Sequence, residues 1–145
     1  TAGYPARTRM AIRTGGSGDV TDSAVAWKFP RQASYVPSPV FHNGHLYSVL
    51  DEGMLLCFDA KTGDIKWQER LGGRFRASLL LADGLIFATN NKGVTTIVRA
   101  SPDSFQQVSV NHLGVSCYAT PALSNGRLFI RTAENLYCIG KPQNL

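Results

Sequence analysis

A turn recurs at nearly constant spacing along this 145-residue sequence. Asn or Asp followed by Gly ends at Gly44, Gly84 and Gly126, which are 40 and 42 positions apart. An apolar stretch precedes each pair, and an apolar and aromatic stretch follows it. Because Asn-Gly and Asp-Gly tolerate the positive φ angles of a type I′ turn, each pair predicts a tight β-hairpin. Self-similarity with a period near 40 residues is typical of stacked small units.

The expected strands of these hairpins are apolar on both faces. This holds for residues 46–49, 55–58, 85–88 and 128–130. A strand with one face in water would alternate apolar and polar residues, so these strands need a covering layer on each side. No window shows the apolar spacing of a helix longer than one turn. Small antiparallel sheets stacked face to face predict an all-β fold of β-propeller blades.

A fourth strand in each unit is expected to be peripheral. Residues 25–28 and 65–68 alternate apolar and polar side chains, as in a strand with one exposed face. The expected strands are 8–13, 24–29, 36–42, 45–50, 54–59, 64–69, 76–82, 85–90, 94–99, 105–110, 117–123, 127–132 and 135–139. The expected organisation is a partial blade over 1–31, blades over 32–70 and 71–113, a three-stranded final blade over 114–140 and a tail over 141–145.

The segment from Cys57 to Trp67 carries a nameable motif. Its Asp59, Thr62, Gly63 and Trp67 resemble the repeat of pyrroloquinoline-quinone-like (PQQ-like) β-propellers. Asp59 and Thr62 can accept hydrogen bonds from turn amides, and Gly63 can supply an unusual φ. The resemblance implies that Trp67 packs between blades. Trp27 is expected to do the same for the partial first blade.

The resemblance also raises the question of a cofactor. Quinone-dependent dehydrogenases of this class hold the quinone and a Ca²⁺ ion at the centre of an eight-bladed ring, next to a Glu, an Asn and a catalytic Asp. The acidic residues of this chain fall mostly in expected turns, and none reads as part of an oxygen cage for Ca²⁺. We therefore assign no catalytic, cofactor-binding or metal-binding residue and expect no cofactor in this chain.

Charge and cysteine content add little about function. Fifteen basic and ten acidic residues give a net charge of +5 at pH 7. The basic residues are scattered, which favours a dispersed, solvated surface: Arg7, Arg9, Arg13, Lys28, Arg31, Arg70, Arg74, Arg76, Arg127 and Arg131. Cys57, Cys117 and Cys138 are an odd set with apolar or aromatic neighbours, so all three are expected to be buried small hydrophobes.

The expected strands make a little over three blades, whereas propellers usually have four to eight. We expect an incomplete ring whose apolar end faces associate with a protein partner or another copy. Either the chain is a piece of a longer protein, which we favour, or it closes as an oligomer. Completion of the last blade by residues 24–29 ranks lowest.

The functional expectation is a non-catalytic scaffold or protein-interaction module. The resemblance implies a periplasmic or secreted location, and no apolar run is long enough to span a membrane. Whether the complete protein has enzymatic activity stays open. One alternative is the C-terminal part of a quinoprotein dehydrogenase that needs PQQ and Ca²⁺ and whose active site lies outside this chain. A second alternative is a polyanion-binding module, although nucleic acid is not an expected partner.

Overall fold

The computed structural model describes residue 1 and residues 6–140, so the expected tail over 141–145 lies outside the described residues. This part of the chain is built from strands and turns. The strands are β1 Thr8–Ile12, β2 Val25–Pro30, β3 Val40–His42, β4 His45–Val49, β5 Met54–Asp59, β6 Ile65–Arg70, β7 Leu80–Ala82, β8 Leu85–Thr89, β9 Val94–Arg99, β10 Gln107–His112, β11 Ala122–Ser124, β12 Arg127–Arg131 and β13 Leu136–Ile139. None of the described residues forms a helix that could cross a membrane.

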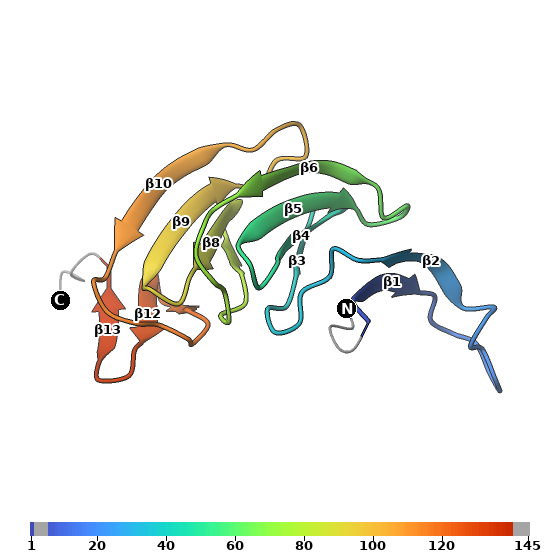
Figure 1. The fold of residues 1–145 in the computed structure, drawn as a ribbon, viewed down its shortest axis with the longest axis horizontal. Coiled ribbons are helices and arrows are strands. Elements are labelled where there is room, and N and C mark those ends of the chain that lie inside the picture. Colours follow the sequence, from blue (N-terminus) through green and yellow to red (C-terminus); the bar gives the residue numbers. More distant parts are fainter. Residues whose placement is uncertain (2–5, 141–145) are drawn as a thin grey trace.

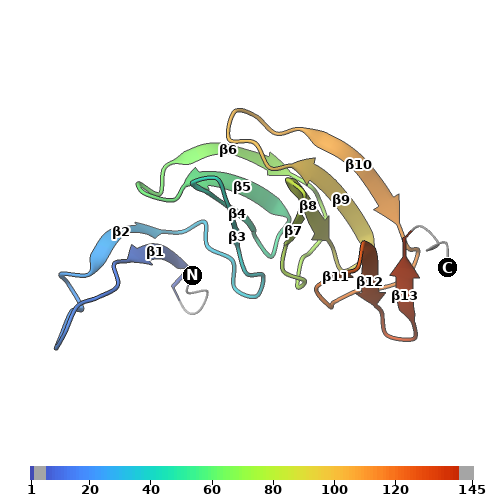
Figure 2. The ribbon, with the colours of Figure 1, turned by 180° about the vertical axis from the view of Figure 1, so that it is seen from behind.

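The strands form separate antiparallel sheets in chain order. The N-terminal sheet is β1–β2, the first blade β3–β6, the second blade β7–β10 and the third blade β11–β13. The sheets fan out along an arc, with the N-terminal sheet at one end and the third blade at the other (Figure 1; Figure 2 from behind). The fold is a β-propeller whose ring is incomplete, which confirms the predicted fold class. Strand β2 pairs with β1 and does not complete the third blade.

The turns that end at the recurring glycines have the backbone conformation that their sequence predicts. Asn43 and Gly44 have φ of 45° and 80°, and Asp83 and Gly84 have φ of 49° and 70°. The third pair behaves in the same way, with 49° at Asn125 and 69° at its glycine. Positive φ at both central residues is the type I′ geometry, whose twist suits a two-residue hairpin.

The first strand of each blade is shorter than the sequence predicts. The expected strands 36–42, 76–82 and 117–123 are only three residues long, at Val40–His42, Leu80–Ala82 and Ala122–Ser124. The segment before each strand makes other hydrogen bonds: the Ser38 amide donates to the Ser78 hydroxyl of the next blade instead of to a ladder partner. The segment before each short strand is therefore a connection between blades and not part of the ladder.

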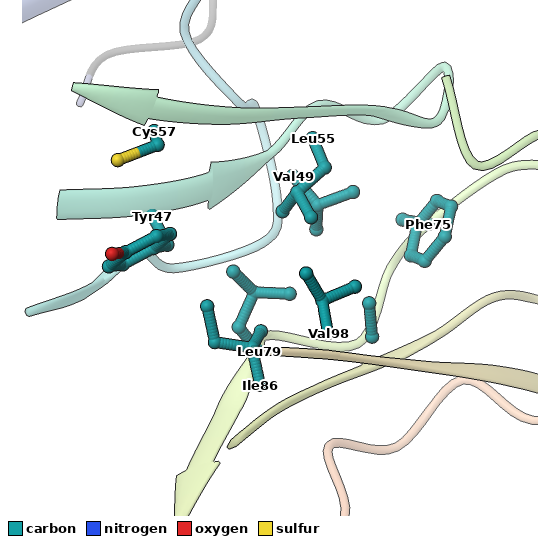
Figure 3. Packing of buried hydrophobic residues seen from close by; sticks show 9 residues of the cluster. Tyr47, Val49, Leu55, Cys57, Phe75, Leu79, Ile86 and Val98 are labelled. Atoms are coloured by element: carbon teal, nitrogen blue, oxygen red, sulfur yellow. The ribbon is translucent and has the colours of Figure 1, made fainter. Parts of the chain in front are cut away.

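The main core lies between sheets. Tyr47, Val49 and Leu55 of the first blade pack against Ile86 and Val98 of the second, and each is fully or almost fully buried (Figure 3). A second cluster between the N-terminal sheet and the first blade contains Leu50, Leu56 and Phe58, with Trp27 packed against it. Consecutive residues of β5 thus enter different clusters, because alternate side chains point to opposite faces of a strand.

The cysteines do not share one environment. Cys57 and Cys117 are buried, as predicted, but Cys138 is exposed, so the prediction for that residue is wrong. Cys138 lies on β13, and within the described part of the chain no strand pairs with the outer edge of β13. Its apolar neighbours in the sequence therefore do not bring burial.

Candidate functional site

The motif identified in the sequence forms the turn between β5 and β6. One oxygen of Asp59, Oδ1, accepts hydrogen bonds from the amides of Lys61 at 2.8 Å and Thr62 at 3.2 Å. Thr62 Oγ1 accepts from the Asp64 amide at 3.2 Å, and Gly63 has a φ of 78°. The two backbone hydrogen bonds to the carboxylate lower the pKa of Asp59. The residues of the motif are therefore held together by the turn they define.

The two tryptophans join neighbouring sheets. The Trp67 indole N–H donates to the Ser101 carbonyl oxygen in the second blade at 2.9 Å, and its ring centroid lies 5.8 Å from that of Phe105. The Trp27 indole N–H donates to the Ala60 carbonyl oxygen in the first blade at 3.1 Å. Each indole thus belongs to one sheet and donates its hydrogen bond to the next sheet. Its role is therefore structural.

A buried arginine completes the contact between the N-terminal sheet and the first blade. Arg9 is 3% exposed, which contradicts the expectation that the basic residues all lie on a solvated surface. Its Nη2 donates to the Gly63 carbonyl oxygen at 3.1 Å, and its guanidinium carbon lies 4.8 Å from the Phe29 ring centroid and 5.2 Å from that of Phe58. Burial lowers the pKa of Arg9, partly opposed by Asp64. Aromatic faces and carbonyl oxygens, not solvent, surround this cation.

Hydroxyl groups connect the segments that lead into the blades. The Ser38 amide donates to Ser78 Oγ at 2.9 Å, and the Ser78 amide donates to Thr120 Oγ1 at 2.9 Å. These residues precede the first strands of three consecutive blades. The connections β2–β3, β6–β7 and β10–β11 are therefore neighbours at one end of the sheets.

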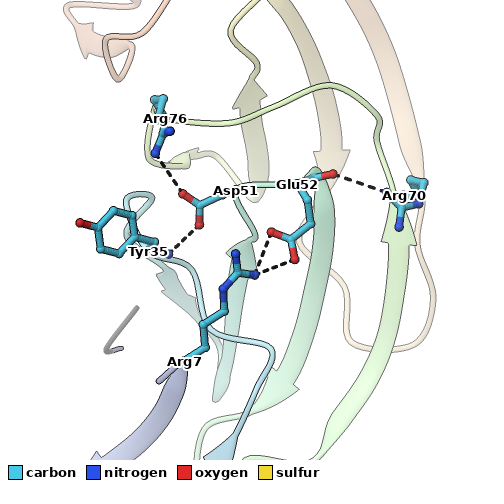
Figure 4. Close-up of polar contacts among 6 residues, drawn as sticks. All are labelled: Arg7, Tyr35, Asp51, Glu52, Arg70 and Arg76. Carbon is cyan, nitrogen blue, oxygen red and sulfur yellow. Dashed lines mark hydrogen bonds and ion pairs between the residues drawn. The ribbon is translucent and has the colours of Figure 1, made fainter. Parts of the chain in front are cut away.

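Four arginines and two acidic residues gather beside these connections. Arg7 Nη1 donates to both Glu52 carboxylate oxygens, at 2.7 and 3.0 Å (Figure 4). Asp51 accepts from the Tyr35 amide at 2.6 Å and forms an ion pair with Arg76 at 3.5 Å. A surface cavity of about 620 Å³, open to solvent, lies at this cluster. Its lining residues are Arg7, Asp51, Glu52, Arg70, Gly73 and Arg74.

This arginine–acidic cavity is suited to binding rather than to general acid–base or nucleophilic catalysis. Arginine stays protonated near neutral pH, and its planar fork can hold carboxylates or phosphates bidentately. Two carboxylates are already matched by Arg7 and Arg76, whereas the exposed Arg74 has no side-chain partner among the described residues. The cavity therefore presents the unpaired Arg74 guanidinium near the carboxylates of Asp51 and Glu52, which are already paired.

Exposed apolar side chains flank the cavity on the same connections. Tyr35 is 59% exposed, Val36 is 42% exposed and Tyr118 is 60% exposed. The hydroxyl contacts described above make these connections neighbours, so we group their exposed side chains with the cavity. We call this surface the connection face: Arg7, Tyr35, Val36, Asp51, Glu52, Arg70, Arg74, Arg76 and Tyr118.

The donor set for a metal is not assembled in this part of the propeller. Over residues 1 and 6–140, no three His, Cys, Asp or Glu side chains converge in a group that could hold a metal ion.

Comparison with known proteins agrees with the stacked-sheet architecture. A family model described as outer membrane protein assembly factor BamB matches residues 17–108. Since the match covers most of the chain, this protein belongs to that family, within the PQQ-like β-propeller repeats. No curated protein matches the sequence closely enough to add to this assignment.

Solved structures show the same fold at low sequence identity. BamB from Moraxella catarrhalis superposes with a TM-score of 0.66 at 16% identity, over 81% of this chain and 37% of that one. The quinohemoprotein alcohol dehydrogenase ADHIIG from Pseudomonas putida HK5 gives 0.54 at 13% identity, over 66% of this chain and 16% of that one. A europium-containing methanol dehydrogenase gives 0.50 at 14% identity, over 65% and 20%. The chain thus spans well under half the length of these proteins.

The sequence reasoning missed the connection face. It treated Arg7, Arg70, Arg74 and Arg76 as separate solvated charges, whereas the fold brings them together. One signal was present: three of them lie within seven residues, in the segment that joins two predicted blades. The contact of Arg7 with Glu52, across 45 residues, had no such signal.

Proposed function

We propose that this chain is a non-catalytic scaffold that binds a protein partner through the connection face. The observation that carries the proposal is the cavity of about 620 Å³, in which arginines outnumber carboxylates. Exposed Tyr35 is hydrogen-bonded through its amide to Asp51 at the cavity, and exposed Tyr118 lies on the neighbouring β10–β11 connection. Tyrosine and arginine are enriched at protein interfaces and at the residues that dominate their binding energy.

The chemistry of the face favours an acidic segment of a folded partner. Unmatched guanidinium groups bind carboxylates bidentately, and the tyrosine rings supply apolar contact area. The carboxylates of Asp51 and Glu52 hold Arg76 and Arg7 in place, so little side-chain ordering is needed on binding. A face whose arginines are already partly oriented in this way suits a module that positions other proteins.

The family description supports a particular setting for the scaffold. Its words name an outer membrane protein assembly factor. By that likeness we propose an extracytoplasmic location and a role in holding an assembly together at the outer membrane. The exposed end faces of the arc are additional candidates for self-association.

Photo-crosslinking of the full-length protein in its native cells tests the proposal. A crosslinking amino acid at Tyr118 or Val36 should trap one defined protein, and the Arg74→Glu exchange should reduce that product at least several-fold. The same crosslinker at Lys61, at the opposite end of β5 from Glu52, is the control and should not trap it. Equal trapping from both ends, or insensitivity to Arg74→Glu, would contradict the assignment.

Resemblance of fold to two dehydrogenases supports a second candidate, in which this chain is part of a quinoprotein enzyme. In that case the residues that hold PQQ and Ca²⁺ lie outside the chain. Addition of PQQ and Ca²⁺ to the full-length protein should then restore alcohol-dependent reduction of a dye. Absence of quinone binding would leave the scaffold as the supported function.

The arginines of the cavity also support a polyanion-binding module. Such binding would weaken steeply with added salt, because counterions are released when phosphates or sulfates are neutralised. Titration with heparin at increasing NaCl concentration distinguishes this case, since a protein partner held by tyrosine rings and a few ion pairs should show a shallower dependence.

A further inference from the structure

The contact between the second and third blades differs from the other two contacts in the arc. A cavity of about 350 Å³ lies there. It is lined by Phe87, Thr95, Ile97, Asn111, His112, Leu113, Leu128, Ile130 and Ile139, which come from both blades. Both core clusters lie at the earlier contacts, and neither includes a residue of the third blade.

Strand register explains why this contact is hollow. On the last two strands of each sheet, Trp27 lies opposite Ala11 and Trp67 lies opposite Cys57. In the second blade the residue opposite Ile97 is Ser109. Ser109 therefore stands where the other two sheets place a tryptophan. The larger Ile97, in place of Ala or Cys, fills part of the space.

The cavity shares two walls with the corresponding space in the repeat and lies beside Ser109, which is not itself among its lining residues. Tyr47 and Cys57 flank the Trp67 ring, and the Tyr47 and Trp67 ring centroids are 6.0 Å apart. Their register counterparts in the second blade are Phe87 and Ile97, and both line the cavity. Phe87 thus provides the aromatic ring that Tyr47 provides in the first blade, but no indole packs beside Phe87 as Trp67 packs beside Tyr47.

The cavity has an apolar interior and a polar rim. Ile130 is 2% exposed, whereas Asn111 and His112 are exposed. Asn111 Nδ2 donates to Ser109 Oγ at 3.3 Å, which leaves the Asn111 side-chain carbonyl oxygen as an acceptor at the rim. A ligand that suits this arrangement has an apolar ring and one hydrogen-bond donor at its edge.

We propose that this interblade cavity binds a small aromatic molecule of the size and polarity of indole. Its ring stacks or packs edge-on against Phe87 between the blades, and its N–H donates to Asn111 at the rim. The same fold already places an indole at each of the two sister contacts, where the N–H donates to a backbone carbonyl oxygen. A volume of about 350 Å³ is large enough for one fused ring system.

Titration of the protein with 5-fluoroindole tests the proposal. Fluorine NMR should show saturable line broadening, and the melting temperature should rise with ligand concentration. The Ser109→Trp exchange supplies the missing indole from the chain itself. It should abolish both effects and raise the melting temperature of the free protein.

Val110→Trp is the matched control: Val110 follows Ser109 in the regular part of the ladder, where it pairs with Thr96, so its side chain points to the other face of β10, and it is 40% exposed. That variant should bind the probe as the unchanged protein does. If Ser109→Trp fails to fold, Phe87→Trp, which enlarges a side chain in the same cavity, takes its place. No saturable binding, binding that survives the filled cavity, or equal loss in the control would overturn the proposal.

Discussion

Asp59 shows how a single side chain can organise a turn. One carboxylate oxygen accepts hydrogen bonds from two backbone amides, and the neighbouring Thr62 hydroxyl accepts a hydrogen bond from a third. These bonds are local, so the spacing of Asp, Thr and Gly in the sequence specifies them. Trp67 differs, because its hydrogen-bond acceptor and its aromatic neighbour Phe105 come from another blade.

The lowered pKa of Asp59 makes a prediction about acid stability. The ionised form is favoured in the folded protein, so its contribution is complete above the unfolded pKa of about 3.9 and is lost as the pH falls through the lower folded value. Asp59→Asn should therefore destabilise the protein near neutral pH, and the difference from wild type should shrink below about pH 4. Urea unfolding between pH 2 and 7 measures this. A difference that is constant with pH would contradict it, and Asp64→Asn is the control within the same turn.

Removal of the Trp67 ring should weaken the contact between the first and second blades. We expect Trp67→Ala to lower the free energy of unfolding by about 3 kcal/mol, the lower end of the range for such exchanges because the side chain is only half-buried. Trp67→Phe keeps most of the ring but loses the hydrogen bond to Ser101, so about 1 kcal/mol is expected from that loss. Denaturant unfolding measures both. A change within about 0.5 kcal/mol for the alanine variant would place the ring outside the packed contact.

At the scale of the element, two kinds of glycine turn can be separated. Gly84 and Gly63 both have positive φ, at 70° and 78°. A Cβ on Gly84 would meet nothing within 4 Å, whereas a Cβ on Gly63 would lie 2.5 Å from Phe29 and 2.8 Å from Trp27. Gly84 is thus needed only for the backbone conformation of its own hairpin. Gly63 is needed for its turn and also for the close approach of the N-terminal sheet.

These environments predict different costs for the same exchange. Gly84→Ala should lower the free energy of unfolding by about 1 kcal/mol, from backbone strain in the left-handed region. Gly63→Ala should cost at least about 1 kcal/mol more, because Trp27 and Phe29 must also shift. Parallel chemical denaturation of the two variants provides the comparison. Equal costs would mean that the N-terminal sheet does not pack closely on this turn.

At the scale of the molecule, the arc is unevenly packed. The first and second blades share nine buried core residues, and Trp67 packs against this cluster. In the third blade, by contrast, all residues of β11 and all but Tyr137 of β13 are exposed. Stability that comes from contacts between sheets should therefore decrease toward the third blade.

Hydrogen exchange should reveal this gradient. Amide protons of β12 that are hydrogen-bonded in the sheet should exchange faster than those of the equivalent strands β4 and β8, because local opening exposes less buried apolar surface there. Exchange measured by mass spectrometry on overlapping peptides can resolve the three strands. Uniform protection would show that the third blade is held as firmly as the others.

Much of the architecture could be predicted from the sequence. Asn43-Gly44 and its two counterparts specify hairpins through the positive φ that these residues tolerate, and the double-sided apolar strands require stacked sheets. Both signals depend on residues adjacent in the sequence and on the strand period of two, so they can be recognised without knowing the rest of the fold.

The tertiary structure decided the features that depend on which sheet lies beside which. It buried Arg9 between Phe29 and Phe58, brought Arg7 to Glu52 and left Cys138 on an open edge. Local sequence does not encode these neighbours, because the Gly63 carbonyl oxygen that binds Arg9 and the Glu52 carboxylate that binds Arg7 come from 54 and 45 residues away. The sequence by itself thus determined the repeating unit, and the stacking of the units determined which distant side chains lie together on its surface.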